Sequence, residues 1–444
     1  MRPKALGPVL ILFLLTAFLP SSTGATPPLP PVKGADPELA AWQTLPPIAP
    51  EILRRIEPAL LREMAEGEKT VSFIVYLKEG ADLAAATAGR VSASERRQAV
   101  ITALQATSER SQGEARAYLA GQQARGNVRR YTPYWIFNGL AVEGDRETLL
   151  ALASRPEVKV IRADRKLYLE ESADGPKRSA AVEWNIAKIR ADLVWQALGI
   201  DGTGVVVANM DSGVDWQHPA LQTKYRGYDP HGLYKHFGNW YCATDEGYTY
   251  PYDGHGHGTH TMGTIVGGGD PAIGVAPGAR WIAVKAFRDD GYTYDSWLHA
   301  GFQWLLDPDG NPSTDDAPDV VNNSWGSSEG YLETFRPDVQ ALLAADIFPV
   351  FSAGNDGPAE YTVGSPASFP ESFAVGATNS DDYVAYFSSR GPSPWSETKP
   401  EVSAPGVNVR SSLPGGSYGE REGTSMAAPH VVGPLLFSFK RSQV

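Results

Sequence analysis

Residues 204–210 read GVVVANM, and residues 211–215, DSGVD, follow them directly. The first segment is a continuous apolar run rich in valine, which predicts a buried β-strand. Similar apolar runs recur at residues 281–286, 320–323, 348–352 and 373–377. Short apolar strands that alternate with helical or loop segments favour a mostly parallel sheet with helices on both faces. The predicted fold class is therefore α/β.

Polar side chains stand where two of these predicted strands end. Asp211 follows the first run, and Asn355 follows the run at 348–352. Ligands bind at the carboxyl ends of strands in such sheets, so both residues are candidates for a polar site. Each also has a local interpretation, because Asp and Asn are common in turns. Alternatively, the Asn355 amide donates a hydrogen bond into a site.

Residues 255–263, HGHGTHTMG, hold three of the eight histidines among small residues. One hypothesis makes His255, His257 and His260 the ligands of a metal-dependent hydrolase with an HxHxDH pattern. Thr259 stands where that pattern has its aspartate. The other hypothesis makes one histidine a general base at the start of a helix.

Residues 423–430, GTSMAAPH, place Ser425 on a tight turn before a helix-prone run. This segment does not match the G-x-S-x-G nucleophile elbow, because Ala427 replaces its last glycine. Taken alone, Ser425 is equally well explained as a helix N-cap. Taken together, Asp211, His257 and Ser425 occur in the chain order Asp, His, Ser that is found in subtilisin.

Five segments in this order resemble the signatures of the subtilisin-like serine proteases, or subtilases. They are DSGVD, HGTH, NNSWG, SAGN and GTSMAAPH. The resemblance implies a subtilisin-like fold and an acyl-transfer mechanism. In that mechanism Ser425 attacks the scissile carbonyl, His257 transfers the proton, and Asp211 orients and stabilises the imidazole.

The resemblance also implies how substrate is held. It assigns the oxyanion hole to the Asn355 side-chain amide and the Ser425 backbone N–H. Residues Ser324, Trp325 and Gly326 match the strand that pairs with an extended peptide. The chemistry requires no cofactor, and no metal ligand is assigned. Structural calcium is common in the family, and the acidic pairs Asp289-Asp290 and Asp315-Asp316 offer oxygen ligands.

Residues 51–170 predict a small α+β unit that precedes the catalytic domain. Strand patterns at 71–77, 135–142 and 158–169 alternate with helical patterns at 92–124 and 147–153. The unit contains neither histidine nor cysteine, and we find no chemistry in it. Residues 71–170 resemble the intramolecular chaperone prodomain of subtilases, so the chain's own prodomain is an expected partner and inhibitor.

The segments outside these two units predict export and processing. Residues 1–25 are typical of a signal peptide, because Arg2 and Lys4 precede an apolar run that is too short to span a membrane. Secretion without a stable membrane anchor is therefore expected. Residues 26–50 form a proline-rich linker, and 171–182 form a second linker that contains the expected maturation site.

The catalytic domain is expected to extend over residues 183–444. Within it, Gly433-Pro434 is predicted to interrupt the helix that follows Ser425, because an interior proline costs about 3 kcal/mol. Subtilases usually continue this helix and then add a further strand and helices, whereas this chain stops at Val444, so we expect a domain that is truncated at its C-terminus.

The charge of the chain is unevenly distributed. The total is 39 Lys+Arg against 51 Asp+Glu, or −12, which argues against nucleic acid as a partner. Residues 1–182 contribute 24 − 20 = +4, and residues 183–444 contribute 15 − 31 = −16. This difference predicts electrostatic help in docking the prodomain. The single cysteine, Cys242, excludes an internal disulfide.

The function predicted from the sequence is that of a secreted serine endopeptidase acting on proteins or peptides. Two alternatives remain at this stage. One is an inactive, truncated peptide-binding protein, and the other is the metal-dependent hydrolase that uses the histidine cluster.

Overall fold

The computed structural model of the protein describes residues 49–170, 183–269 and 272–441. The predicted signal peptide, the linker at 171–182 and all but the last two residues of the linker at 26–50 lie outside the described residues. Among the described helices, none is both long and apolar enough to cross a membrane.

The N-terminal region is built on a four-stranded sheet whose strands follow the order β2-β3-β1-β4. All three pairings are antiparallel. Helix α4 is the longest, and a capping box between Ser92 and Glu95 begins it. The strands are β1 (Val71–Leu77), β2 (Val128–Tyr134), β3 (Gly139–Gly144) and β4 (Val158–Ala163). The helices are α1 (Pro50–Leu53), α2 (Pro58–Ala65), α3 (Leu83–Thr87), α4 (Ala93–Ala124) and α5 (Arg146–Ala153).

Three details of the sequence prediction for this region were wrong. Strand β2 was not predicted. The strand predicted at 135–142 begins only at Gly139, because Trp135–Asn138 form a turn in which Asn138 has a φ of 53°. The single strand predicted at 158–169 divides into β4 and a separate strand, β5 (Lys166–Tyr168).

The remainder of the described chain is built on a seven-stranded sheet with the order β13-β12-β11-β10-β6-β8-β7. Every pairing in this sheet is parallel, which confirms the predicted α/β class. Its strands are β6 (Val206–Asp211), β7 (Trp240–Cys242), β8 (Arg280–Lys285), β10 (Val320–Asn323), β11 (Phe348–Ser352), β12 (Phe373–Thr378) and β13 (Val402–Pro405). Two antiparallel pairs lie outside it: β14 (Val409–Leu413) with β15 (Ser417–Arg421), and β5 with β9 (Tyr292–Tyr294).

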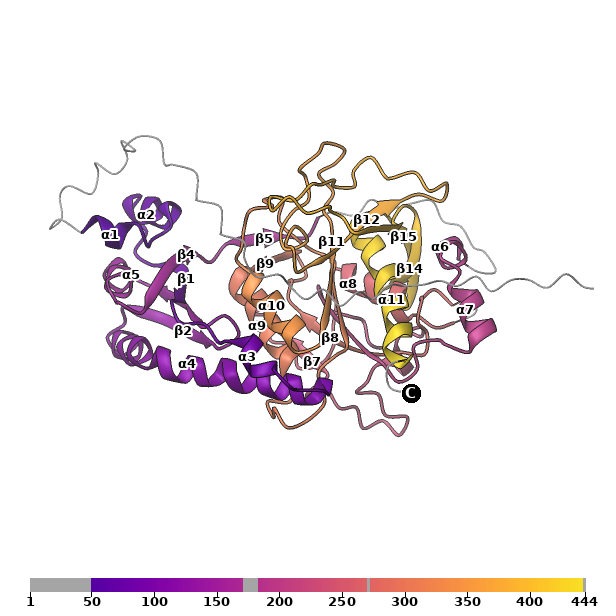
Figure 1. Ribbon diagram of the computed structural model, residues 1–444, viewed down its shortest axis with the longest axis horizontal. Helices are drawn as coiled ribbons and strands as arrows, with labels where there is room; N and C mark the ends of the chain where they lie inside the picture. The colour runs from indigo at the N-terminus through magenta and orange to yellow at the C-terminus, as the bar shows by residue number, and fades with distance from the viewer. Residues whose placement is uncertain (1–48, 171–182, 270–271, 442–444) are drawn as a thin grey trace, which may run out of the picture. The chain divides into compact units, whose positions relative to one another are not determined.

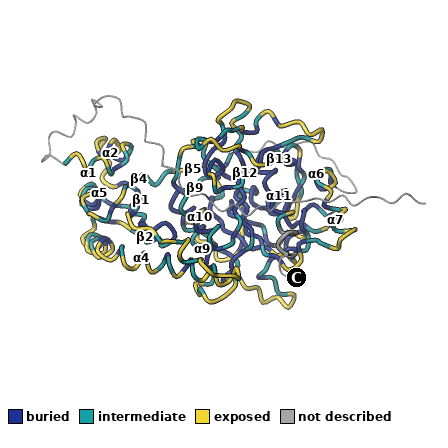
Figure 2. The backbone as a smooth tube through the Cα atoms, in the orientation of Figure 1, coloured by how far each residue is buried: buried dark blue, intermediate teal, exposed yellow. Residues whose placement is uncertain are grey.

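Helices cover both faces of the parallel sheet (Figure 1). The apolar side chains of α8 and α11 pack in one core cluster and those of α9 and α10 in another. Strand β6 contributes Val207 to the first cluster and Ala208 to the second, as the alternation of side chains along a strand requires. The strands between these helices form the buried centre seen in Figure 2. The helices are α6 (Trp184–Lys188), α7 (Ala191–Leu198), α8 (His257–Val266), α9 (Asp295–Leu306), α10 (Arg336–Ala344) and α11 (Thr424–Arg441), with a 3₁₀ turn, η2 (Gln222–Lys224).

The strand order reverses at β6. From β6 the chain proceeds to β8 on one side and to β10, β11, β12 and β13 on the other. The carboxyl ends of β6 and β10 therefore flank the switch point, which is where open parallel sheets bind their ligands.

The predicted interruption of α11 at Gly433-Pro434 was wrong, because the helix continues through Pro434 to Arg441. A proline removes one backbone donor and bends a helix, but it does not have to end it. The first half of α11 packs against β10, β11, β12 and β13, and Met426, Ala427, Ala428 and Val432 are fully buried. This packing offsets the cost of the proline.

Candidate active site

Asp211 and His257 form a buried pair at the switch point. Asp211 is the last residue of β6, His257 is the first residue of α8, and their relative exposures are 0% and 1%. His257 Nδ1 lies 2.7 Å from Asp211 Oδ1. The Ser212 backbone N–H also donates to Asp211 Oδ1 at 2.7 Å. With the proton assigned to Nδ1 by this contact, the free base of the imidazole is Nε2.

A glycine allows α8 to approach Asp211 so closely. A Cβ atom on Gly258 would lie 2.1 Å from the Gly213 carbonyl oxygen. No other residue fits there without moving the helix away from the loop. The small residues of HGHGTH therefore position His257.

Ser425 is the second residue of α11, at the end of β10. Its hydroxyl donates to the Ser324 carbonyl oxygen at 3.0 Å, and the Ser324 hydroxyl donates to the Ser425 carbonyl oxygen at 2.8 Å. His257 Nε2 is buried and has no hydrogen-bond partner among the described residues. A serine–histidine hydrogen bond therefore requires the Ser425 hydroxyl to leave Ser324. Catalytic hydrogen bonds often tighten only when substrate is present.

The Asn355 side chain bonds both to the start of α11 and to a carboxylate of the N-terminal region. Asn355 Oδ1 accepts from the Thr424 backbone N–H at 2.9 Å and from its hydroxyl at 3.0 Å. The Nδ2 group thus faces the other way, and it donates to the Glu170 carboxylate together with the Asn355 backbone N–H. Burial, with the nearby negative charge of Asp356 second, raises the pKa of Glu170.

Glu170 reaches Asn355 because the residues before it form a strand against β9. Lys166 pairs with Tyr294, Leu167 with Thr293 and Tyr168 with Tyr292, all antiparallel. The Leu169 backbone N–H then donates to the Gly291 carbonyl oxygen at 2.8 Å. The chain's own segment thus occupies an extended, strand-paired site beside Asn355. Sequence reasoning missed β9, whose only signal is a short aromatic run after the turn Asp-Asp-Gly.

The segment Ser324–Gly326 lies beside Ser425, but its side chains are not available to a peptide. The Trp325 side chain is 4% exposed. It packs against four aromatic rings of the core: Phe287, Phe302, Phe335 and Phe351. Pairing with an extended peptide through the backbone of this segment stays a prediction.

The structure does not bring the three histidines together as metal ligands. His260 Nε2 donates to the carbonyl oxygens of Val409 and Gly419, at 3.0 and 3.2 Å. Burial lowers the pKa of His260 well below its usual value and keeps this imidazole neutral. In the described ranges, the cluster of convergent metal-ligand atoms consists of three aspartates elsewhere in the fold. His255 and His260 are thus left as polar packing residues.

Comparisons with known proteins agree with this geometry. Residues 202–437 match the subtilase family of peptidases, S8, and residues 72–170 match the peptidase inhibitor I9 family. The chain belongs to the subtilase family. The resemblance inferred from the five motifs is thereby confirmed.

The relatives of this subtilase differ in how much of the chain they align with. It is 43% identical to bacillopeptidase F of Bacillus subtilis over 419 residues, which are 86% of this chain and 29% of that protein. It is 35% identical to subtilisin E of the same species over 282 residues, which are 62% of this chain and 66% of subtilisin E. It is 36% identical to the subtilisin of Bacillus pumilus over 258 residues, or 57% and 82% of the two chains. The chain spans less than a third of the length of bacillopeptidase F and just under two thirds of subtilisin E.

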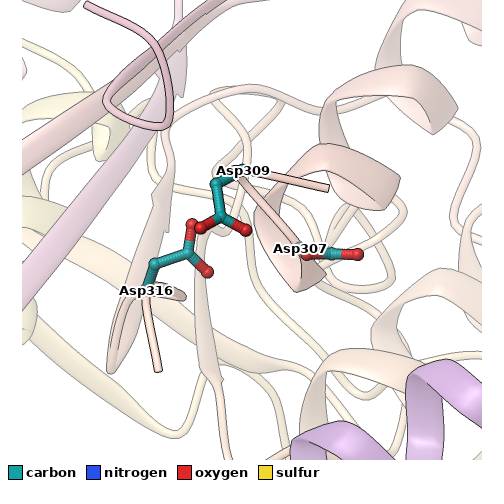
Figure 3. Close-up of side chains that lie close together, drawn as sticks. All are labelled: Asp307, Asp309 and Asp316. Atoms are coloured by element: carbon teal, nitrogen blue, oxygen red, sulfur yellow. The ribbon is translucent and has the colours of Figure 1, made fainter. Parts of the chain in front are cut away.

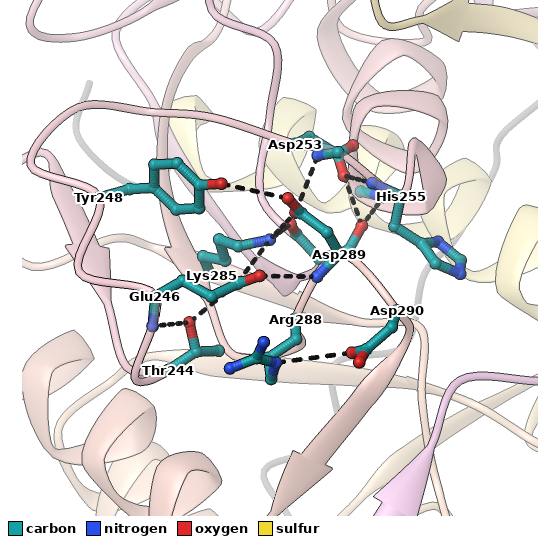
Figure 4. A network of polar contacts seen from close by, with 12 residues as sticks. Thr244, Glu246, Tyr248, Asp253, His255, Lys285, Arg288, Asp289 and Asp290 are labelled. Atoms are coloured by element: carbon teal, nitrogen blue, oxygen red, sulfur yellow. Dashed lines mark hydrogen bonds and ion pairs between the residues drawn. The ribbon is translucent and has the colours of Figure 1, made fainter.

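A network that sequence reasoning missed holds the loops around Asp211 and His257 (Figure 4). Asp253, which is 3% exposed, accepts hydrogen bonds from the Ser212 hydroxyl and from the backbone N–H groups of Gly256 and Thr259, at 2.8–2.9 Å. It thereby satisfies free donors at the N-terminus of α8. Lys285 is fully buried and donates to the Ser212 carbonyl oxygen at 2.8 Å and to Asp289 at 2.7 Å. Both side chains fix the turn that follows Asp211.

Basic residues of the I9 region meet acidic residues of the subtilase region. Arg97 of α4 is 7% exposed, and its guanidinium lies 2.7 Å from Asp315 and 3.7 Å from Asp319. Arg165 lies 2.8 Å from Asp295 at the start of α9. These contacts have the polarity that the charge difference between the two regions predicts.

Proposed function

We propose that this chain is a serine endopeptidase that hydrolyses peptide bonds through an acyl-enzyme on Ser425. The observation that carries the proposal is the buried Asp211–His257 pair, whose free Nε2 atom lies at the N-terminus of α8. Helix α8 packs against α11, which holds Ser425 near its own N-terminus. A buried imidazole with a free nitrogen, on a helix that packs against the helix of a serine, is compatible with the arrangement that activates a hydroxyl nucleophile.

In the proposed reaction the Ser425 oxygen attacks the scissile carbonyl while His257 Nε2 takes the hydroxyl proton. Asp211 stabilises the imidazolium that forms and keeps its orientation. The Asn355 amide and the Ser425 backbone N–H donate to the oxyanion. His257 then returns the proton to the leaving amine. Water next attacks the acyl-enzyme while His257 takes a proton from it, and His257 gives that proton to the Ser425 oxygen as the acyl group leaves.

We also propose that the region before residue 171 acts as an inhibitor in a zymogen. Support comes from the I9 match and from β5, which fills the strand position on β9 and leads to Glu170 at the Asn355 amide. A peptide substrate would bind in the same extended form once this segment leaves. Export through residues 1–25 and a maturation cut within 171–182 belong to the same proposal.

Hydrolysis of unfolded casein by the processed protein tests the peptidase activity. The matched variants are Ser425→Ala and Ser380→Ala, because Ser380 is exposed and lies outside the site. We expect Ser380→Ala to keep the parental rate and Ser425→Ala to lose at least about 10⁴-fold, the scale seen when subtilisin loses a triad residue. A parent that is folded and processed yet inactive would favour the peptide-binding alternative. Activity that survives in Ser425→Ala and is lost only with a transition-metal chelator would favour the metal-dependent hydrolase.

A further inference from the structure

Exposed aromatic and apolar side chains gather on the chain between β6 and α8, which joins the two residues of the buried catalytic pair. Tyr234, Tyr250 and Tyr252 are 37–46% exposed, and we refer to them as the tyrosine patch. Leu233 and Phe237 of the same connection are 74% and 80% exposed. Single apolar residues on a surface are ordinary, whereas a group of them commonly marks a binding surface.

Aromatic rings beneath the patch connect Tyr234 to Tyr250. The ring centroids of Tyr234 and His236 lie 4.5 and 5.6 Å from that of Trp216. The His236 ring also lies 6.5 Å from the Tyr250 ring, and its Nδ1 atom lies 3.1 Å from the Tyr225 hydroxyl. Trp216 and Tyr225 are buried, so the patch is anchored in the core. Side chains that are already held in this way lose little freedom when they bind a partner.

Tyr252 lies closest to the catalytic loops. Its ring stacks on the Tyr248 ring at 4.4 Å, and the Tyr248 hydroxyl donates to Asp289 Oδ2 at 3.2 Å (Figure 4). The Tyr252 carbonyl oxygen packs against Gly213, where a Cβ atom would lie 1.9 Å from it. The next residue, Asp253, is the acceptor that caps the start of α8. Tyr252 is therefore fixed beside the turn that follows β6.

A peptide bound along β9 passes close to this connection. The chain's own segment marks the route, because the Leu169 backbone N–H donates to the Gly291 carbonyl oxygen at 2.8 Å. A Cβ atom on Gly291 would lie 3.2 Å from His255 Nε2, and His255 is three residues after Tyr252. The loop from Asp253 to His255 therefore links Tyr252 to the strand position on β9.

The patch stays exposed while the cleft is occupied. In the described residues, β5 fills the strand position on β9, and all three tyrosines of the patch keep their exposure. Binding at the patch therefore does not require the I9 region to leave. This separates the patch from the cleft as a place where substrate makes contact.

We propose that the tyrosine patch binds apolar segments of unfolded protein substrates outside the cleft. Tyrosine rings offer a large contact area at a small cost in conformational entropy. Unfolded chains present apolar and aromatic side chains that folded proteins bury, so this surface favours unfolded substrates. A chain held at the patch has a raised local concentration at the cleft. The identity of the ligand rests on the proposed peptidase function, but the binding itself does not need the reaction.

Binding of unfolded protein by the full Ser425→Ala chain tests the patch without catalysis. Fluorescence anisotropy follows the titration of fluorescein-labelled casein. The patch variant carries Tyr234→Ser and Tyr250→Ser together, and the control is Tyr383→Ser, which changes an exposed tyrosine in the turn after β12. Circular dichroism verifies the fold of each chain.

We expect Ser425→Ala alone and with Tyr383→Ser to bind casein equally, and the patch variant to bind at least about tenfold more weakly. Equal affinity in the patch variant would overturn the proposal. A folded Ser425→Ala chain that binds no casein would overturn it as well.

Hydrolysis by the processed enzyme gives a second readout. The patch variant should raise KM for casein by about tenfold and leave kcat near the parental value, because the lost contacts serve binding and not the reaction. Both constants for a short peptide anilide should stay unchanged, since such a substrate fills only the cleft. An equal loss with both substrates would overturn the proposal. An inactive parent whose casein binding depends on the tyrosines would contradict the peptidase function and still support the patch.

Other occupants of the patch predict different results. A second copy of the chain predicts a dimer in analytical ultracentrifugation that the patch variant dissociates. A lipid surface predicts co-sedimentation with phosphatidylcholine vesicles that the patch variant loses. Either result, together with unchanged casein binding, would overturn the assignment to substrate.

Discussion

Replacing Arg97 by alanine should weaken the hold of the I9 region on the subtilase region. Arg97 lies on the buried face of α4, and its guanidinium makes three hydrogen bonds to the subtilase region. Nε donates to the Ala345 carbonyl oxygen at 3.2 Å, Nη2 to the Pro318 carbonyl oxygen at 3.4 Å, and Nη1 to Asp315 at 2.7 Å. Truncation removes all three donors at once.

The size of the effect follows from the burial of each partner. The Asp315 side chain is 63% exposed, so solvent limits that ion pair to at most about 1 kcal/mol. The two carbonyl oxygens lose a charged donor in a buried interface, at about 1.5 kcal/mol each for bonds of this length. The sum is about 3–4 kcal/mol, which corresponds to roughly 10²–10³-fold in affinity.

The assay is inhibition of the processed enzyme by residues 51–170 added as a separate chain. The control is Arg116→Ala, which changes an exposed residue of the same helix. We expect the inhibition constant to rise by roughly 10²–10³-fold for Arg97→Ala and to stay near the parental value for Arg116→Ala. Added salt should weaken parental inhibition further, because several of the interface pairs are partly exposed. An inhibition constant that is the same for both variants, or that is independent of salt, would refute the electrostatic account of docking.

Three further predictions concern the site itself. Asn355→Ala should lower kcat by about 10²–10³-fold with little change in KM, which is the loss that removal of this type of donor causes in subtilisin. Steady-state kinetics measure the effect, and a fall in kcat of less than about tenfold would count against the role of Asn355. Burial of Glu170 in the docked region raises its pKa, so docking takes up a proton. Inhibition by the separate I9 region should be strongest below the ordinary pKa of a glutamate and should weaken, then level off, as pH rises through the raised pKa. In Glu170→Gln this dependence should flatten and inhibition at neutral pH should be tighter, whereas an unchanged pH profile of the inhibition constant would exclude the contact. Asp253→Ala should lower the free energy of unfolding by about 2–4 kcal/mol, because buried donors of Ser212 and Thr259 lose their acceptor. Denaturant unfolding measures this, and an unchanged denaturation midpoint would exclude the capping role of Asp253.

Elements with a strong local pattern could be predicted from the sequence. The runs at 320–323 and 348–352 coincide with β10 and β11, because strands buried on both faces are mostly apolar, although β10 ends in the buried Asn322 and Asn323. Strand β2 lacks this signal, because it lies at the edge of its sheet and most of its residues are exposed or half-buried. Local sequence therefore indicates central strands more readily than edge strands, although the edge strand β4 was predicted within 158–169.

The sequence likewise identified some residues of the candidate site and missed others. Asp211, His257 and Ser425 lie in recognisable segments, and the fold places them at strand and helix ends around one switch point. Strands β5 and β9 are three residues each and pair across more than a hundred residues of chain, so neither carries a local pattern strong enough to predict it. Asp253 and Lys285 act only through tertiary hydrogen bonds, which no spacing in the sequence encodes.

The pair Asp315-Asp316 illustrates how little a run of acidic residues in the sequence says about their contacts. Asp315 and Asp316 are neighbours, yet one pairs with Arg97 and the other turns to Asp307 and Asp309 (Figure 3). Which carboxylates keep free oxygen atoms depends on the basic residues that other segments bring to them.

Covalent labelling tests the central claim that Ser425 is the nucleophile. The processed chain is treated with a serine-directed phosphonate, and intact mass followed by peptide mapping locates the adduct. We expect one label per chain, on Ser425, and no label after the protein is denatured, because reactivity depends on His257 and Asp211 in the folded site. A folded, processed chain that takes up no label, or that carries it on another serine, would contradict the account.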